Sequence, residues 1–154
     1  MRRLDVNRCG FSKITCEYFI LTPVKNVGNT VYIGGMASDK RMLMSAAETA
    51  VITNDRVDIR TFWLGAVGMR KDGVIVSSRN IAAPDYAPDH HAEVRLARKL
   101  TPGSTVWVAR VARCDGEWAM AKPCRGCERR LKAAGVSRVV YTIGPGEWGV
   151  KEFK

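Results

Sequence analysis

Apolar side chains along this chain recur with two periods, one typical of helices and the other of strands. After Ser38, residues such as Met42, Ala46 and Ala50 return at helical spacing and predict an amphipathic helix. Short runs rich in β-branched and aromatic residues predict strands. The order of the predicted helices and strands, which alternate along the chain, implies an α/β protein with a mixed sheet and helices on its faces. The predicted elements are a helix over residues 38–53, strands over 62–69 and 74–78, a helix over 89–100, a strand over 105–111, a helix over 123–135, and strands over 138–143 and 148–153.

Turn and cap residues mark the ends of several predicted elements. Asp72-Gly73 between two apolar runs predicts a hairpin. Asp89 is placed to cap the helix of residues 89–100. Pro123 suits the first position of the following helix, and Gly135 suits its C-terminal cap. Residues 115–122 are predicted to form a loop that leads to Pro123.

Residues 1–35 are set apart as an N-terminal extension. Two β-rich runs, residues 15–21 and 30–33, are separated by a turn-like segment, which indicates a β-hairpin. Cys9 and Cys16 lie in this region, and their spacing without a nearby His favours free thiols over metal ligands. The remaining residues, 36–154, form one predicted domain, as the length of 154 residues suggests.

The composition of the chain indicates what kind of partner it binds and in which compartment it works. The net charge of +10 favours anionic partners such as nucleotides or nucleic acid. Five cysteines, an odd number, argue against a disulfide framework and for a reducing compartment. No apolar run is long enough for a signal core or a membrane span. The sequence therefore predicts a cytoplasmic protein that does not bind membranes.

Two short motifs carry the chemistry: His91-Ala92-Glu93 and Pro123-Cys124-Arg125-Gly126-Cys127. One His and two Cys supply three zinc ligands and leave the fourth tetrahedral position open, as in catalytic zinc sites. Glu93 is not needed as a ligand and is free to move protons. The alternative is a closed structural zinc site, in which His90 or Cys114 would be the fourth ligand.

With Leu64-Gly65-Ala66-Val67 before the Asp-Gly hairpin, these motifs resemble the cytidine and deoxycytidylate deaminase superfamily. The resemblance covers roughly residues 40–154, and Lys122-Pro123-Cys124 makes it similar to small deaminases of phage genomes. It implies a three-layer α/β/α fold with a mixed five-stranded sheet. The short turn before Trp148 implies an antiparallel final strand, as in the cytidine deaminase branch, and points away from adenine as substrate.

By this resemblance, His91, Cys124 and Cys127 bind Zn²⁺ and Glu93 is the proton shuttle. The implied reaction is hydrolytic deamination of cytosine to uracil by hydroxide formed at the metal. The backbone of Ala92 would position the base, and Asn80 would contact the sugar. The other reading of Asn80 is a loop residue that bonds to nearby backbone.

Three classes of function remain open. The first is an enzyme of free cytosine nucleosides or nucleotides, with dCMP favoured by the charge. The second is a deaminase of single-stranded DNA or RNA, for which Trp118 or Trp63 would stack bases. The third is a zinc-stabilised binding module, against which Glu93 argues. The resemblance also implies a homo-oligomer. Further candidate substrate contacts are Arg79, Trp118, Lys122, Pro123 and Arg125.

Overall fold

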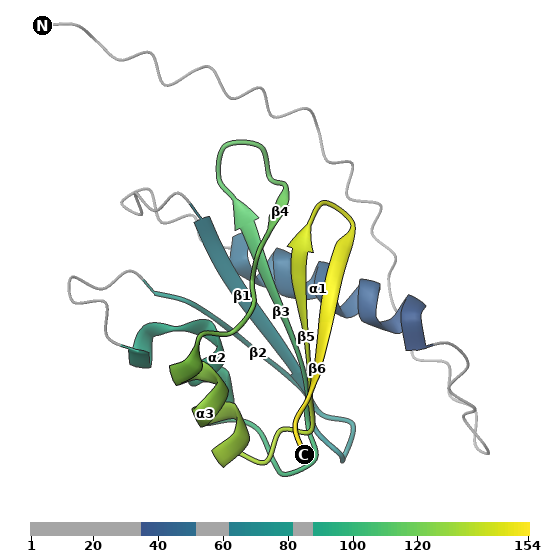
Figure 1. Ribbon diagram of the computed structural model, residues 1–154, viewed down its shortest axis with the longest axis vertical. Coiled ribbons are helices and arrows are strands. Elements are labelled where there is room, and N and C mark those ends of the chain that lie inside the picture. Colours follow the sequence, from purple (N-terminus) through teal and green to yellow (C-terminus); the bar gives the residue numbers. More distant parts are fainter. Residues whose placement is uncertain (1–34, 52–61, 82–87) are drawn as a thin grey trace, which may run out of the picture. The chain divides into compact units, whose positions relative to one another are not determined.

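The computed structural model describes residues 35–51, 62–81 and 88–154. The predicted N-terminal hairpin, Cys9, Cys16 and the predicted end of the first helix near Asn54 lie outside these residues. In the described part, a single sheet lies between helices on its two faces (Figure 1). None of the helices in this part is both long and apolar enough to cross a membrane.

The sheet has six strands in the order β2-β1-β3-β5-β6, with the short β4 paired to β3 outside this path. Only β3 and β5 run parallel, and every other pairing is antiparallel, so the sheet is mixed as predicted. The antiparallel pairing of β5 with β6 confirms the predicted return of the last strand. The strands are β1 (Phe62–Met69), β2 (Ile75–Arg79), β3 (Thr105–Ala112), β4 (Trp118–Ala119), β5 (Arg138–Gly144) and β6 (Glu147–Glu152).

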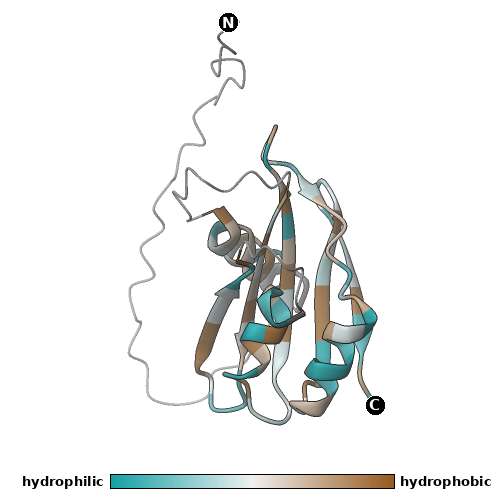
Figure 2. Ribbon diagram, turned by 90° about the vertical axis from the view of Figure 1, so that its left-hand side faces the viewer, coloured by the Kyte–Doolittle hydropathy of each residue, from teal (hydrophilic) through white to brown (hydrophobic). Residues whose placement is uncertain are grey.

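The helices are α1 (Gly35–Val51), α2 (Ala92–Ala97) and α3 (Arg125–Ala133), with a 3₁₀ turn, η1 (Pro88–His90), before α2. In Figure 1, α1 passes behind the strands, and α2 and α3 lie in front of them. Many residues of the strands are hydrophobic, whereas α2 and α3 carry many hydrophilic residues (Figure 2).

Several details differ from the sequence prediction, among them the second helix, which spans Ala92–Ala97 rather than residues 89–100. β4 was predicted as loop, but Trp118 and Ala119 pair with β3 and add a sixth strand. Asp89 does not cap α2, because it lies in η1 and its carboxylate pairs with the side chains of Arg98 and Arg130. Pro123 is not the first residue of α3, because Cys124 occupies the N-cap position.

Each face of the sheet has its own core. On the α2 and α3 side, Ala66, Leu96, Val108 and Leu131 belong to one buried cluster. On the α1 side, Leu43 packs with Trp107 and Val140. Gly65 permits close approach of α1, since a Cβ at this position would collide with the carbonyl oxygen of Ala46. Successive residues of a strand point to opposite faces of the sheet. Every second residue of a strand therefore lies on the α1 side, and the residues between them lie on the α2 and α3 side.

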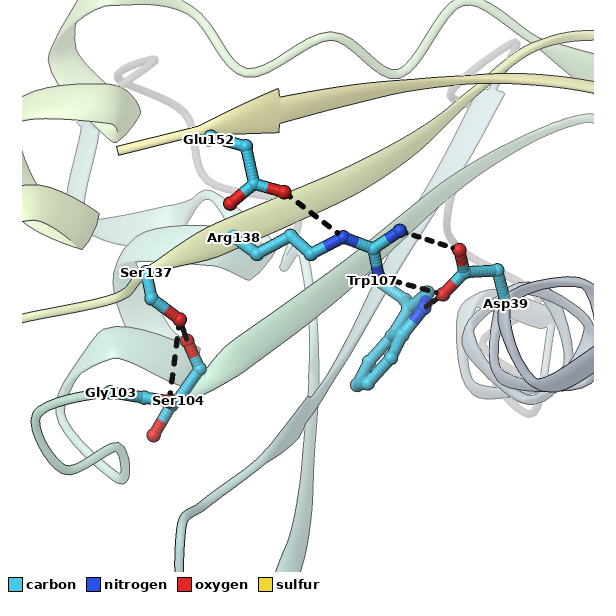
Figure 3. A network of polar contacts seen from close by, with 7 residues as sticks. All are labelled: Asp39, Gly103, Ser104, Trp107, Ser137, Arg138 and Glu152. Carbon is cyan, nitrogen blue, oxygen red and sulfur yellow. Dashed lines mark hydrogen bonds and ion pairs between the residues drawn. The ribbon is translucent and has the colours of Figure 1, made fainter. Parts of the chain in front are cut away.

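A buried ion pair fixes α1 to the sheet (Figure 3). Asp39, only 5% exposed, accepts two hydrogen bonds from the Arg138 guanidinium at 3.0 and 2.7 Å and one from the Trp107 indole at 2.8 Å. The Oε1 of Glu152 lies 3.4 Å from the Nε of Arg138, which the bonds to Asp39 leave unused. Burial raises the pKa of Asp39, but the hydrogen bonds from Arg138 and Trp107 and the charge of Arg138 outweigh it and lower the pKa overall.

We expect Asp39→Asn to lower the free energy of unfolding by about 2 kcal/mol at pH 7, because the buried, charge-assisted hydrogen bonds of the Asp39 carboxylate are lost. Since the folded pKa of Asp39 is below its ordinary value of 3.8, this stabilisation is complete above that value and disappears as the pH falls through the folded pKa. Urea unfolding of both proteins at pH 7, 5 and 3 measures the difference. A difference that stays constant down to pH 3 would contradict this role for the ion pair.

Candidate zinc centre and active site

Three potential metal ligands converge where α2 and α3 begin. His91 is the N-cap residue of α2, Cys124 is the N-cap residue of α3, and Cys127 lies in the first turn of α3. Their ligand atoms all lie within 4.8 Å of one another. The structure thus joins residues more than thirty positions apart into the group that the two motifs predict.

The spacing within this group fits a tetrahedral zinc ion. His91 Nδ1 lies 3.2 Å from Cys127 Sγ and 3.9 Å from Cys124 Sγ. Zinc bond lengths to sulfur and imidazole nitrogen imply roughly 3.5 Å between such atoms in a tetrahedron. The observed distances lie on either side of that value, so the three side chains fit Zn²⁺ without rearrangement of the helices.

The local electrostatics distinguish the two cysteines. Cys124 is exposed, and its sulfur accepts a hydrogen bond from the Cys127 backbone N–H at 3.5 Å. Cys127 is fully buried, and burial together with the nearby charge of Glu93 raises the pKa of its thiol. A cation is therefore needed to hold Cys127 as thiolate, and bound zinc supplies that charge.

Glu93 lies in the first turn of α2, two residues after His91, and is 3% exposed. Its Oε2 is buried and has no hydrogen-bond partner in the structure. Burial raises the pKa of Glu93, although its own backbone N–H, His91 and Cys127 act in the opposite direction. A buried carboxylate beside three metal ligands, with one oxygen that has no partner, is suited to exchange a proton with a bound molecule.

The residues that flank the ligands fall into two groups. Ala92, which directly follows His91 in the chain, and Pro123, which directly precedes Cys124, are both buried, and Ala92 packs in the core cluster on the α2 and α3 side. Lys122 and Arg125 are exposed on either side of Pro123-Cys124 and present cationic side chains there.

Asn80 follows β2 and is fixed to β1 by two hydrogen bonds. Its backbone N–H donates to the Leu64 carbonyl at 3.0 Å, and its Oδ1 accepts from the Leu64 N–H at 3.1 Å. Because only oxygen can accept from that N–H, the orientation of the amide is determined, and Nδ2 remains as a donor. Asn80 thus bonds to neighbouring backbone and still has a donor for a ligand.

The family model described as "Cytidine and deoxycytidylate deaminase zinc-binding region" matches residues 37–143, more than two thirds of the chain. The chain belongs to this deaminase family. It is therefore a zinc-dependent hydrolase that deaminates a cytosine-containing substrate, and His91, Cys124 and Cys127 are the candidate ligands for its zinc. No curated protein matches the sequence.

Solved structures agree with the fold. A cytidine deaminase from Burkholderia pseudomallei is 19% identical with a TM-score of 0.53, over 73% of this chain and 91% of the other. A cytidine deaminase from Mycobacterium leprae is 17% identical with a TM-score of 0.46, over 72% of this chain and 91% of the other. The first of these shows that the fold is that of a cytidine deaminase.

In this deaminase, the alternative of a closed structural zinc site finds no support. Among residues 35–51, 62–81 and 88–154, the candidate ligand group contains His91, Cys124 and Cys127 alone. His90 and Cys114, the residues considered as a fourth ligand, are not members of it. Three protein ligands without a fourth among the described residues are what a catalytic zinc site has, with its fourth position for water or substrate.

Two predicted substrate contacts lie on the other side of the sheet. Trp118 packs against the cluster of Leu43, Trp107 and Val140 on the α1 side. Arg79 pairs across the strands with Gly65, whose missing side chain would point at α1. Since directly paired residues share a face of the sheet, Arg79 also points to the α1 side. Neither side chain is brought to the zinc centre within this chain.

The sequence reading missed two arginines, one on the side of the sheet that α2 and α3 cover and one on α2 itself. Arg110 shares the α2 and α3 side with Val108, and its guanidinium lies 3.9 Å above the ring of Phe62 and 3.4 Å from the Met120 carbonyl oxygen. The alternation of side chains in the predicted strand could have shown that Arg110 lies on the same face as Val108. Arg95, two residues after Glu93, donates to the Arg79 carbonyl. Helical spacing shows that it shares a face with Lys99, but nothing local reveals its partner.

Proposed function

We propose that this deaminase acts on a free cytosine nucleotide and converts dCMP to dUMP within residues 36–154, with residues 1–35 as an extension. The observation that carries the proposal is the unpartnered, buried Oε2 of Glu93 beside the three ligands. A binding module gives no reason to keep a carboxylate without a partner in that place, because an unsatisfied buried polar group is destabilising.

His91, Cys124 and Cys127 would hold the zinc ion, which when bound supplies a water of lowered pKa. Hydrolysis adds the water oxygen to C4 of cytosine and releases the amine as ammonia. Glu93 takes a proton of the water at Oε2, delivers it to the ring nitrogen N3, and later transfers a proton to the departing amine. Ala92 and Pro123 enclose the base, and Asn80 Nδ2 donates to the sugar.

The surface of the described residues supports a single nucleotide rather than a strand. Non-specific single-strand binding needs aromatic platforms along a basic groove. Trp63 pairs with Val111, and Val111 with Trp118, so both tryptophans that could have served as platforms lie on the α1 side. Lys122 and Arg125, exposed on either side of Pro123-Cys124, are available as cations for one phosphate.

The test is ammonia release by the zinc-loaded protein with dCMP, deoxycytidine, cytidine and a cytosine-bearing single strand. We expect the highest kcat/KM for dCMP and a modest loss of activity between 50 and 200 mM salt. Turnover of the strand alone, with the steep salt dependence of counterion release, would replace this proposal by the polynucleotide alternative. Size-exclusion chromatography of the same sample tests the predicted homo-oligomer.

A further inference from the structure

The edge of the sheet next to the zinc centre is closed by two cationic side chains, Arg95 of α2 and Lys99 of the turn that follows α2. β2 is an edge strand. Because Asn80 forms the hydrogen-bonded pair with Leu64, the alternation of an antiparallel ladder turns the carbonyls of Arg79 and Ser77 away from β1. The Arg95 Nη1 donates to the Arg79 oxygen at 2.7 Å, and the Lys99 Nζ donates to the Ser77 oxygen at 2.7 Å.

The contacts of Arg95 and Lys99 reach different places on β2. Lys99 reaches the middle of β2, whereas Arg95 reaches the last residue of the strand, directly before Asn80. Arg95 is also the nearer of the two to Glu93, two positions away on the same helix. Its side chain is therefore a direct tie between the helix that carries Glu93 and the strand end that carries Asn80.

The segment around Asn80 is held on each side of that residue. Arg95 binds the carbonyl before it, and Leu64 binds its backbone N–H and its Oδ1. After it, the Ile81 N–H donates to the carbonyl of His90 at 3.2 Å, next to the ligand His91. Of these ties, the bond from Arg95 is the one made by a side chain of α2.

We propose that Arg95 is a positioning residue, which sets the distance between Asn80 and the group of His91 and Glu93 and thereby the fit of the nucleotide sugar. This inference rests on the proposed function, in which Asn80 donates to the sugar. A charge-assisted hydrogen bond to a backbone oxygen is among the stronger and more directional contacts of a protein. Loss of it lets the strand end move, so that Asn80 no longer lies where it can bind the sugar, and the nucleotide binds less tightly.

The experiment compares Arg95→Met with Lys99→Met, which removes the same charge and a bond of equal length to the same strand. We expect Arg95→Met to raise KM for dCMP about tenfold with kcat changed less than about threefold, because a sugar contact acts alike in ground and transition states. Lys99→Met should leave both parameters unchanged. Zinc content should stay the same in both variants.

A double-mutant cycle separates positioning from a direct contact with substrate. If Arg95 acts through Asn80, adding Arg95→Met to Asn80→Ala should raise KM less than about twofold further. An undiminished effect of Arg95→Met in the Asn80→Ala background, or equal effects of Arg95→Met and Lys99→Met, would overturn the proposal.

Hydrogen exchange gives a reading that does not depend on activity. Arg95→Met should speed exchange of the Asn80 and Ile81 amides, whereas Lys99→Met should not. If the unmodified enzyme turns over no cytosine substrate, the proposed function fails, but faster exchange in Arg95→Met alone still supports the tie. Unchanged exchange of both amides would refute it.

Discussion

Replacing Glu93 by glutamine is expected to lower kcat for cytosine deamination by roughly 10³-fold, the usual contribution of general acid–base catalysis. Glutamine has the same shape and fits the buried site, but it cannot carry a proton between water, N3 and the amine. Glu93 is not one of the three grouped ligands, so zinc should remain at one ion per chain. Ammonia release and metal analysis of the same preparation measure both quantities.

Glu117→Gln is the matched control, because it removes one negative charge from an exposed position in the turn before β4. It should leave kcat unchanged. Glu93→Gln with kcat within about tenfold of the unmodified enzyme would remove Glu93 from the proton path. Loss of zinc in Glu93→Gln would instead show that the carboxylate holds the metal.

Replacement of either Cys124 or Cys127 by alanine is expected to abolish zinc binding and all turnover, because two protein ligands remain. The loss of bound metal should lower the free energy of unfolding by about 4 kcal/mol where free zinc exceeds its dissociation constant a thousandfold. Metal analysis and urea unfolding with and without zinc measure the effect. Two variants that each retained one zinc would contradict the ligand assignment.

The two cysteine variants should differ once a chelator removes the metal from all proteins. Cys124 is exposed, so Cys124→Ala should then lose only the long N-cap hydrogen bond of its sulfur and be about 0.5 kcal/mol less stable than the unmodified chain. Cys127 is fully buried, so Cys127→Ala should remain less stable by about 1 kcal/mol through lost packing. Cys114→Ala, which removes an exposed thiol outside the ligand group, should bind zinc normally.

The zinc centre could be predicted from sequence because each of its parts is local. Cys124 and Cys127 are three residues apart at a helix start, and His91 and Glu93 are two residues apart at the start of the preceding helix. The order of elements was likewise readable from apolar periodicity. The sequence did not reveal β4, because two residues, Trp118 and Ala119, are too few to show alternation.

Features that depend on distant residues escaped the sequence reading. Asp39 meets Trp107 and Arg138 across 68 and 99 positions, and no local pattern links them. The side of the sheet occupied by Trp118 and Arg79 follows from strand register, which also depends on the partner strands. A residue that is close to a motif in sequence can therefore face away from the site, when its place in the strand turns its side chain to the opposite face of the sheet.

The most direct test of the account is the fate of the water oxygen. Zinc-loaded enzyme is incubated with dCMP in water enriched in ¹⁸O, and the product is examined by mass spectrometry while ammonia is counted. Hydrolytic deamination predicts dUMP that carries one ¹⁸O in the base and one ammonia per dUMP. Unchanged dCMP, with zinc bound at one ion per chain, would contradict the claim that the centre of His91, Cys124, Cys127 and Glu93 is the active site of a dCMP deaminase.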